Sequence, residues 1–237
     1  MQYPEQRLLA AQSAHSCDWL MAPPITVVGL RLSYEAVRIA VGVRSGTNLC
    51  EPHQCPCGTM VDARGLHGLS CRRSAGRQQR HSFLNDIIWR ALGRAKIQAT
   101  KEPLGLSRTD GKRPDGVTLI PWSRGKCATW DVTVPDSFAQ SHLPYTSLAA
   151  CAAAEKAALL KTAKYINLQT SHIFVPIAIE TAGSWNSEGL DFVCDLGRRL
   201  KQVTGDPLKL TYLFQRLSVA VQRGNELSFM GSFAPSD

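Results

Sequence analysis

Hydrophobic and polar positions follow different periods in successive parts of the chain. In residues 1–49, an amphipathic stretch includes residues 8–10, and apolar residues repeat at helical spacing over 34–43, after a break at two consecutive prolines. These patterns predict helical pieces, but they contain no candidate chemistry and no sign of an independent core. Because the chain begins abruptly, we expect residues 1–49 to form a helical linker that belongs to a longer protein.

The middle of the chain combines one helical pattern with two extended runs. Ser82 is a favourable N-cap residue, and an apolar stripe at helical spacing continues from it to about Ala95, so we expect a helix there. Residues 117–122 and 127–134 have the pattern of strands, and the Ser-Arg-Gly-Lys segment between them predicts a hairpin turn. This part of the chain is therefore expected to contain a helix followed by a β-hairpin.

The second half predicts three more helices and a strand. The Ala-rich stretch 147–168 combines high helix propensity with a face of small residues, and 173–180 is a strand rich in β-branched residues. Two further helices are expected over 187–204 and 207–226. The order of these elements predicts an α/β fold in which a mixed β-sheet is flanked by helices.

Composition and the first residues narrow the class of protein. The chain has 237 residues, of which 44% are hydrophobic, and this is ordinary for a globular protein with one substantial core. No apolar run approaches the roughly 18 residues that span a bilayer, and no basic segment followed by an apolar one stands at the start. We therefore expect a nuclear or cytoplasmic protein that is neither secreted nor bound to a membrane.

Basic residues are unevenly distributed along the chain. The formal net charge is +8, and Arg72, Arg73, Arg77 and Arg80 fall within nine residues that contain no acid. Clustered arginines favour a polyanionic partner, so these four are candidate nucleic-acid-binding residues. The alternative is a solvated basic face that only aids solubility.

Four of the eight cysteines fall within 22 residues, together with two histidines. Without a secretory signal, metal binding is a better explanation for such a group than disulfides. A C-x-C-x9-H-x3-C arrangement, which suits a structural tetrahedral zinc ion, is formed by Cys55, Cys57, His67 and Cys71. Because the first spacing is tight, Cys50 or His53 could replace one of the cysteines. The alternative to a metal site is a group of free reduced thiols.

A zinc ion in this segment would have a mechanical role. Residues 50–80 lack regular periodicity, so the metal would fix a segment that has no core of its own. It would hold the neighbouring arginines against a phosphate backbone, where they would position a nucleic acid without reading its bases. We therefore expect residues 50–80 to be a Cys-Cys-His-Cys zinc knuckle with a basic segment.

Two acids stand in the predicted hairpin. Asp115 opens the first extended run, and Asp131 lies in the second between Trp and Val residues, where a carboxylate is costly unless it is paired or binds a cation. Two acids that converge from adjacent strands can hold Mg²⁺. A register shifted by one residue would instead place them on opposite faces of the sheet. The alternative reading has Asp115 capping a turn and Asp131 in a salt bridge.

Basic side chains on the predicted long helix complete the set. Lys161, Lys164 and Tyr165 stand at positions i, i+3 and i+4 and so share one face of the helix. A lysine over the hairpin could orient an attacking water and neutralise charge that develops on a phosphate. On an Ala-rich helix, the alternative is that the lysines are simply solvated.

The combination of Pro114-Asp115, Asp131 and a helical lysine resembles the PD-(D/E)xK nuclease pattern. Thr133 stands where that pattern usually has its lysine, and nucleases with the lysine displaced onto the following helix include the restriction-like endonucleases of site-specific non-LTR retrotransposons. The fuller order here is similar to that group: a Cys-Cys-His-Cys knuckle, the Arg80-His81 pair opening a helix, the two acids and the segment from Lys161 to Tyr165. The resemblance covers residues 50 to 180.

The resemblance implies a role for each of these residues. Residues 81–230 would form a restriction-endonuclease-like domain in which Asp115 and Asp131 bind catalytic Mg²⁺. Lys161 would be the catalytic lysine, with Lys164 as the second choice, and Tyr165 would support the site. Further acids that could join it are Asp86, Glu155 and Glu180.

The resemblance also implies an activity and partners. In that family the domain nicks the target DNA strand and exposes a 3′ hydroxyl from which a reverse transcriptase primes synthesis. Target DNA, element RNA and an upstream reverse transcriptase domain are therefore the implied partners. Because the sequence contains no Tyr-x-Asp-Asp polymerase signature, we expect either a C-terminal fragment of a longer polyprotein or a degenerate copy.

Two other classes of function agree with the same residues. A catalytically inactive, zinc-dependent nucleic-acid-binding module would bind in a salt-sensitive way and would not cleave. A zinc-stabilised protein-interaction domain would have no affinity for DNA or RNA at moderate salt.

Overall fold

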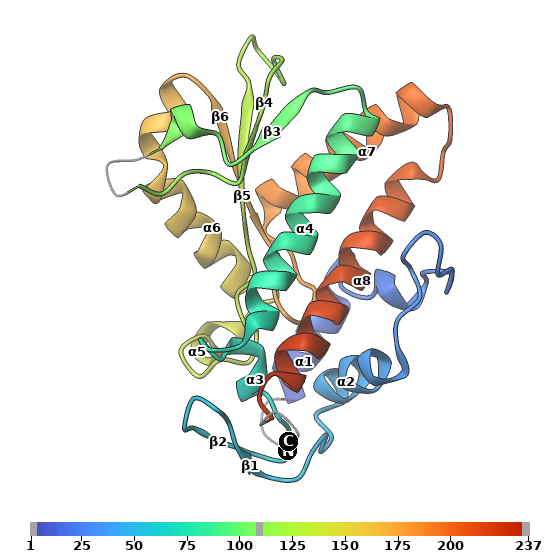
Figure 1. The fold of residues 1–237 in the computed structure, drawn as a ribbon, viewed down its shortest axis with the longest axis vertical. Coiled ribbons are helices and arrows are strands. Elements are labelled where there is room, and N and C mark those ends of the chain that lie inside the picture. The colour runs from blue at the N-terminus through green and yellow to red at the C-terminus, as the bar shows by residue number, and fades with distance from the viewer. Residues whose placement is uncertain (1–3, 108–110, 234–237) are drawn as a thin grey trace.

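The computed structural model describes residues 4–107 and 111–233 and shows a mixed α/β fold (Figure 1). The main sheet has four strands, in the order β3 (Ala99–Lys101), β4 (Gly116–Thr118), β5 (Ala128–Thr133) and β6 (Ile173–Ala178). The pairs β3–β4 and β4–β5 are antiparallel, whereas β5 and β6 run parallel. The predicted α/β class, with a mixed sheet and flanking helices, is confirmed.

Three long helices share the main apolar core with β5 and β6. They are α4 (Ala75–Arg94), α7 (Ser187–Thr204) and α8 (Lys209–Met230). The helix α6 (Ala152–Lys164) lies beside β6 (Figure 1). Its small alanines pack against Ala178 of β6 and form a separate apolar cluster there. The two sides of the sheet are therefore covered differently: bulky side chains fill one side, and an alanine-faced helix lies close to the other.

The N-terminal residues pack along α8. The elements η1 (Asp18–Leu20) and α2 (Tyr34–Ser45) contact α8, and α1 (Pro4–Gln12) contacts α2. Figure 1 shows α2 beside α8, and Ile39 of α2 shares an apolar cluster with Phe229 of α8. The predicted helices in this region are present. Their contribution to a core shared with the last helix was not evident from the sequence pattern.

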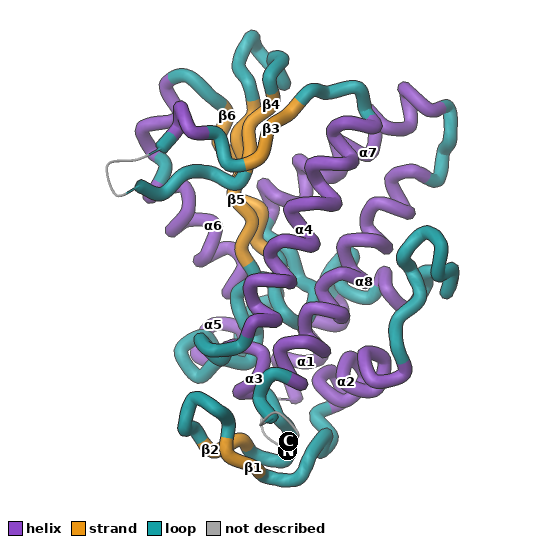
Figure 2. The backbone as a smooth tube through the Cα atoms, in the orientation of Figure 1, coloured by secondary structure: helices purple, strands orange, loops and turns teal. Residues whose placement is uncertain are grey.

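Residues 46–74 contain little regular structure, as Figure 2 shows. Their elements are the short antiparallel strands β1 (His53–Gln54) and β2 (Met60–Val61) and the single-turn helix α3 (His67–Ser70), which contacts α8. The remaining short elements of the described chain are η2 (Leu104–Leu106), α5 (Leu143–Thr146) and η3 (Ile166–Thr170).

The expected start of a helix at Ser82 is wrong, because α4 begins seven residues earlier, at Ala75. The reason is packing against α8. A Cβ built on Gly76 would lie 2.3 Å from the backbone N of Ser228, so this glycine allows the first turn of α4 to lie directly against α8. The Arg80-His81 pair therefore lies inside a helix and does not open one.

The other expected helices and the hairpin are present, and some of them differ from expectation in length. The helix expected over 147–168 is shorter, because Cys151 adopts a left-handed conformation just before α6 and the 3-10 helix η3 follows it. The helix α7 has the expected bounds, and the predicted hairpin turn is confirmed by a bridge between Ser123 and Lys126. Among the helices in the described part of the chain, none is long and apolar enough to cross a membrane.

Candidate functional site

Successive side chains of strand β5 point to opposite faces of the sheet, so apolar and polar groups lie on different faces. Trp130 is fully buried in the core, and its indole N–H donates to Asn85 of α4 at 2.8 Å. The next residue, Asp131, is also buried but points to the opposite face, toward α6. A carboxylate is thus held beside the main core without entering it.

The register of the hairpin brings the second acid to the same place. Gly116 pairs with Trp130 across the two strands, and continuing this antiparallel register places Asp115 opposite Asp131. A Cβ built on Gly116 would lie 2.1 Å from Cζ2 of Trp130, so the indole ring covers the strand where only glycine fits. The register that would have put the two acids on opposite faces is not the one observed.

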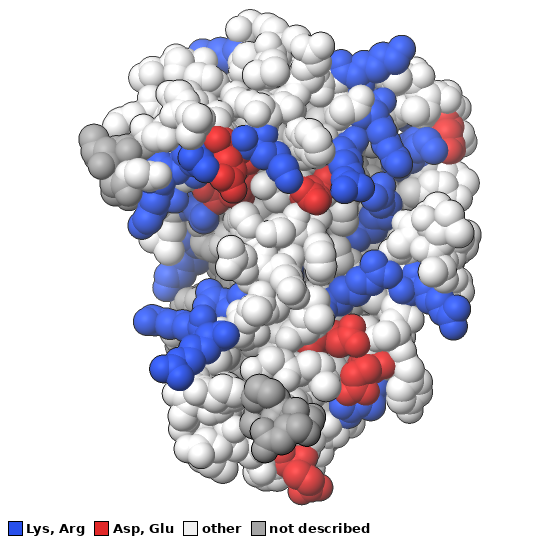
Figure 3. All heavy atoms as spheres, in the orientation of Figure 1, with Lys and Arg blue, Asp and Glu red and all other residues white. Residues whose placement is uncertain are grey.

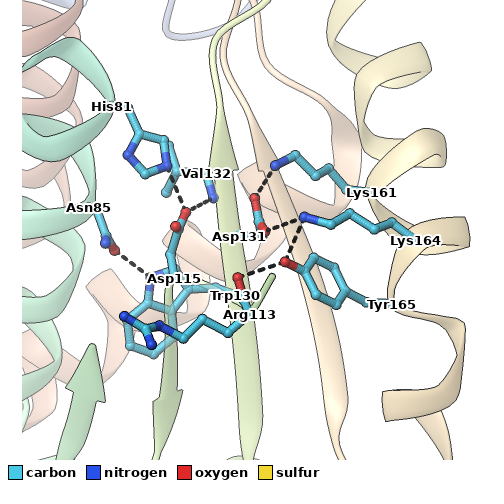
Figure 4. A network of polar contacts seen from close by, with 10 residues as sticks. All are labelled: His81, Asn85, Arg113, Asp115, Trp130, Asp131, Val132, Lys161, Lys164 and Tyr165. Carbon is cyan, nitrogen blue, oxygen red and sulfur yellow. Dashed lines mark hydrogen bonds and ion pairs between the residues drawn. The ribbon is translucent and has the colours of Figure 1, made fainter. Parts of the chain in front are cut away.

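Asp131 interacts with the lysines of α6 (Figure 4). The Lys161 ammonium donates to Oδ1 of Asp131, and Nζ of Lys164 lies 4.0 Å from its Oδ2. Lys164 also donates to the Tyr165 hydroxyl at 2.8 Å, and that hydroxyl donates to the carbonyl oxygen of Arg113 at 2.7 Å. The three residues predicted to share a helix face therefore do gather over the hairpin.

Asp115 has different partners. Its Oδ2 accepts from the backbone N–H of Val132 at 2.5 Å and lies 2.9 Å from Nε2 of His81 on α4. The hydrogen bond to Asp115 raises the pKa of His81. The two acids thus have partners on opposite sides: His81 of α4 contacts Asp115, and the lysines of α6 contact Asp131.

His81 is the residue of this site to which the sequence analysis gave no role. The signal for it was present, because His81 and Asn85 stand at positions i and i+4 of one helix. Two polar residues at that spacing beside an apolar stripe indicate a helix edge that faces polar groups. Both reach the hairpin: Asn85 accepts from Trp130, and His81 pairs with Asp115.

Both acids and both lysines line one open cleft of about 720 Å³. Its other basic lining residues include Arg72, Arg77, Lys112 and Arg113. Glu102 is the one further acid on its wall among the described residues. In Figure 3, Lys and Arg side chains on the left of the view surround a small group of acidic side chains. The cleft therefore combines a carboxylate pair with a predominantly positive wall.

The four predicted nucleic-acid-binding arginines do not behave alike. Arg72 and Arg77 are exposed and line the cleft, whereas Arg73 is exposed but donates to the carbonyl of Pro56 at 2.9 Å. Arg73 thus lies against the segment that contains the first cysteines, outside the cleft lining.

Arg80 borders the cleft but is only 1% exposed, so a phosphate cannot reach its guanidinium in this conformation. The side chain donates to Oδ1 of Asn225 at 2.7 Å and to the carbonyl of Leu69 at 3.2 Å. Burial lowers the pKa of Arg80 to about 10. The expectation that Arg80 contacts nucleic acid is therefore corrected: this arginine ties α4 to α8 and α3.

A second cluster lies in the irregular segment. Cys55, Cys57, His67 and Cys71 place their four ligand atoms within 4.8 Å of one another, so they are positioned to hold a metal ion such as zinc. The Sγ atoms of Cys55 and Cys71 are 3.7 Å apart, and Sγ of Cys57 is 3.2 Å from Nε2 of His67. The predicted set of four ligands is the set that the fold brings together.

The two alternative ligands lie elsewhere. Cys50 Sγ is 3.5 Å from the carbonyl of Asp62, outside the cluster. The ring of His53 stacks on Phe233 at 4.1 Å between centroids, and its Nε2 is 3.1 Å from the Ser232 hydroxyl. Neither residue therefore replaces a member of the cluster.

The cluster thiols differ in their readiness to bind a metal. Hydrogen bonds from the side chain and backbone of Thr59 lower the pKa of Cys57 to about 6, which favours the thiolate that coordinates metals. Burial raises the pKa of Cys55 to about 11, so this cysteine would release a proton on binding.

The three further acids considered for the site do not join it. Asp86 accepts from Lys101 at 2.5 Å, and Glu155 accepts from the backbone N–H of Ser187 at 2.7 Å. Glu180 is buried and accepts from the backbone N–H groups of Ala153 and Ala154, which lie in the first turn of α6. In residues 4–107 and 111–233, Asp115 and Asp131 belong to no group of three or more metal-ligating side chains.

Comparisons with known proteins do not extend this description. No model of a known protein family matches the chain, and no curated protein matches its sequence.

Proposed function

We propose that this chain is a metal-dependent DNA endonuclease domain with a restriction-endonuclease-like core and a structural zinc module, of the kind that nicks target DNA for retrotransposon integration. The observation that supports this most is the meeting of Asp115, Asp131 and Lys161 in one open cleft. Asp115 lies directly before β4, Asp131 lies in β5 and Lys161 lies in α6, yet all three line the same cleft. Asp115, Asp131 and Lys161 were predicted from the sequence as one site.

The donor set fits a hard divalent cation. Carboxylate oxygens are the ligands that Mg²⁺ uses in phosphoryl-transfer sites, where it keeps several waters besides one or two carboxylates. Bound there, Mg²⁺ would activate water and stabilise negative charge on a phosphate. The Val132 N–H and His81 orient the Asp115 carboxylate, and Lys161 orients that of Asp131.

The basic residues would act on the DNA strand. Arg72 and Arg77 lie on the cleft wall, where they can hold the phosphates that flank the cleaved bond. Lys161 and Lys164 place positive charge beside the acids, where it stabilises the negative charge that develops on phosphorus-bound oxygens. Water adds to phosphorus and gives up a proton, the bond from phosphorus to the 3′ oxygen breaks, and this oxygen takes up a proton, which leaves a 3′ hydroxyl and a 5′ phosphate.

Nicking of supercoiled plasmid in the presence of Mg²⁺ tests this proposal. Asp131→Ala is expected to lower the nicking rate at least about 100-fold, which is the scale for loss of a group that stabilises transition-state charge. Asp191→Ala is the matched control, since Asp191 is an exposed acid on α7 outside the cleft. Equal nicking by wild type, Asp131→Ala and Asp191→Ala would remove the mechanism.

A second candidate is a zinc-dependent nucleic-acid-binding module without catalysis. It is favoured by one observation: Asp131 is already paired with Lys161 and Asp115 with His81, so both carboxylates have partners within the protein. This candidate predicts salt-sensitive binding without cleavage, unaffected by Asp115→Ala and lost when zinc is chelated. The plasmid assay and a binding assay on the same variants separate the two functions.

A further inference from the structure

A second basic groove lies between the C-terminal half of α4 and the start of α8. Its volume is about 510 Å³, and its walls come from α4, α8 and the loop over residues 23–30, with Leu200 of α7. The basic lining residues are Arg90, Arg94, Lys209 and Arg216, and no acid lines the groove among the described residues. In Figure 3, Lys and Arg side chains gather on the right of the view, where Figure 1 places α4 and α8.

The arginines converge because of helical spacing. Arg90 and Arg94 stand at i and i+4 of α4, and Tyr212 and Arg216 stand at i and i+4 of α8, so each pair shares one helix face. Burial lowers the pKa of Arg216, and the charges of Arg94 and Arg90 lower it further. Such an effect requires the like charges to be close to one another.

Little negative charge compensates this group. Arg90 lies 3.9 Å from Asp86, but Asp86 is already bound by Lys101 at 2.5 Å. In the described part of the chain, no carboxylate pairs with Arg94 or Arg216 within 4.0 Å. Lys209 is paired with Asp206 at 2.8 Å, so among the described residues the positive charge without a carboxylate partner in the groove comes from Arg94 and Arg216.

The opposite wall of the groove is apolar. Ile25 is 49% exposed and Val28 is 51% exposed, although both belong to a loop with its own backbone hydrogen bonds. Leu30 is the buried part of this loop, and α8 adds the buried Leu213 and the half-buried ring of Tyr212 beside Arg216. A ligand that suits this lining carries both anionic groups and a flat or apolar group.

We propose that this groove binds single-stranded nucleic acid, with phosphates on the arginines of α4 and α8 and an unpaired base against Tyr212 and the apolar loop. A single strand offers both chemistries at once, because its bases are free to stack while its backbone stays charged. A duplex hides its bases and would use only the arginine wall. The inference does not depend on nuclease activity in the cleft.

Charge removal tests the arginine wall. The double variant Arg94→Gln/Arg216→Gln is compared with Arg124→Gln/Arg198→Gln, which removes the same charge from exposed arginines outside the groove. Fluorescence anisotropy with labelled oligo-dT at several salt concentrations is the readout. The groove variant is expected to lose affinity and to reduce the slope of log Kd against log salt by about 1.4, the value for two contacts on a single strand.

Removal of the Tyr212 ring tests whether a base packs against it. Tyr212→Ala is expected to weaken oligo-dT binding about tenfold, and Tyr212→Phe, which keeps the ring, is expected to bind as wild type does. A duplex of the same length should be insensitive to both changes. By contrast, Arg72→Gln/Arg77→Gln in the cleft should weaken duplex binding more than oligo-dT binding.

Two results would overturn the proposal. The first is equal affinity and equal salt slope for the groove variant and its charge-matched control. The second is equal loss of duplex and oligo-dT binding on Tyr212→Ala, which would mean that no base occupies the groove. Because Arg216 is partly buried, the single variant Arg94→Gln, at an exposed position, repeats the charge test with a reduction in slope of about 0.7.

Discussion

The cysteine–histidine cluster and the carboxylate cleft bring their functional groups together in opposite ways. The ligands of the cluster lie within residues 55–71, and their local spacing brings four ligand atoms within 4.8 Å. The groups of the cleft come from α4, the hairpin and α6, and His81 and Lys161 are 80 positions apart in the chain. The first site is local and would be built by its metal, whereas the second depends on the whole fold.

The supporting cores differ accordingly. Around the cluster, the buried apolar residues are Cys55, Val61 and Cys71, and two of these are proposed ligands themselves. The cleft stands on the main core, in which Trp130 is fully buried between the sheet and α4. Loss of the metal should therefore change local structure, whereas loss of a carboxylate should change chemistry and leave the fold in place.

The largest expected effect is removal of the metal. Zinc contributes about 10–16 kcal/mol of apparent binding energy in small zinc modules, and here it would hold a segment with almost no core. Cys71→Ser should lower the zinc content measured by mass spectrometry and increase amide hydrogen exchange in residues 50–71, with α4 still protected. Cys50→Ser is the control, because Cys50 lies outside the cluster. Equal zinc loss in both variants would refute the assigned ligand set.

A smaller effect is expected where the cleft meets the main core. Gly116→Val would place side-chain atoms in the space that the fully buried Trp130 ring occupies, and overpacking of this kind costs about 3 kcal/mol at the upper end of its usual range. Thermal unfolding measures this loss. Gly93→Ala is the control, since a Cβ there meets nothing within 4 Å and alanine favours a helix. A stability loss from Gly93→Ala as large as that from Gly116→Val would contradict the account.

The same contrast explains how much of each site the sequence predicted. The cluster ligands could be named because local spacing alone brings them together. Asp115, Asp131 and Lys161 could be named because a hairpin turn and one helix face have recognisable patterns. The residues that pair with the two carboxylates depend on strand register and on helix packing. The pairing of Asp115 with His81 was therefore not predicted.

Two of the errors, the start of α4 and the role of Arg80, have a common origin, which is α8. The early start of α4 depends on Gly76 packing against Ser228, and the burial of Arg80 depends on Asn225. These contacts join residues about 145 to 154 positions apart, as for Arg80 with Asn225 and Ser74 with Ser228. A local pattern contains no information about such a partner, so a buried arginine has the same appearance in the sequence as the exposed Arg77.

The next prediction concerns the support of α6 from outside the cleft. Glu180 accepts two backbone N–H groups of α6, so Glu180→Ala would leave both without that acceptor and should cost about 2 kcal/mol. Glu180→Gln keeps an acceptor oxygen and serves as the control. If Glu180→Ala and Glu180→Gln have the same stability at neutral pH, these hydrogen bonds do not support α6.

The pH dependence of stability gives Glu180 a second test. Burial raises its pKa in the folded protein, so folding favours the protonated carboxyl. The sign follows from linkage: Glu180 lowers stability as pH rises from its usual value of about 4.5 through the raised value. Denaturant unfolding across that window should show a flatter profile for Glu180→Gln than for wild type. An equally steep decline in both would assign the decline to other groups.

The smallest effect is expected at the edge of the cleft. Tyr165 is buried, and its hydroxyl joins Lys164 to the carbonyl of Arg113, two residues before Asp115. Tyr165→Phe removes these hydrogen bonds without changing the ring, so it should cost about 1 kcal/mol in chemical unfolding. Tyr145→Phe is the control, because the Tyr145 hydroxyl accepts from Lys156 in an exposed hydrogen bond of 3.1 Å. If both variants are as stable as wild type, the structure at the edge of the cleft does not depend on the Tyr165 hydroxyl. Only the carboxylates and lysines of the cleft would then be compared with the metal cluster.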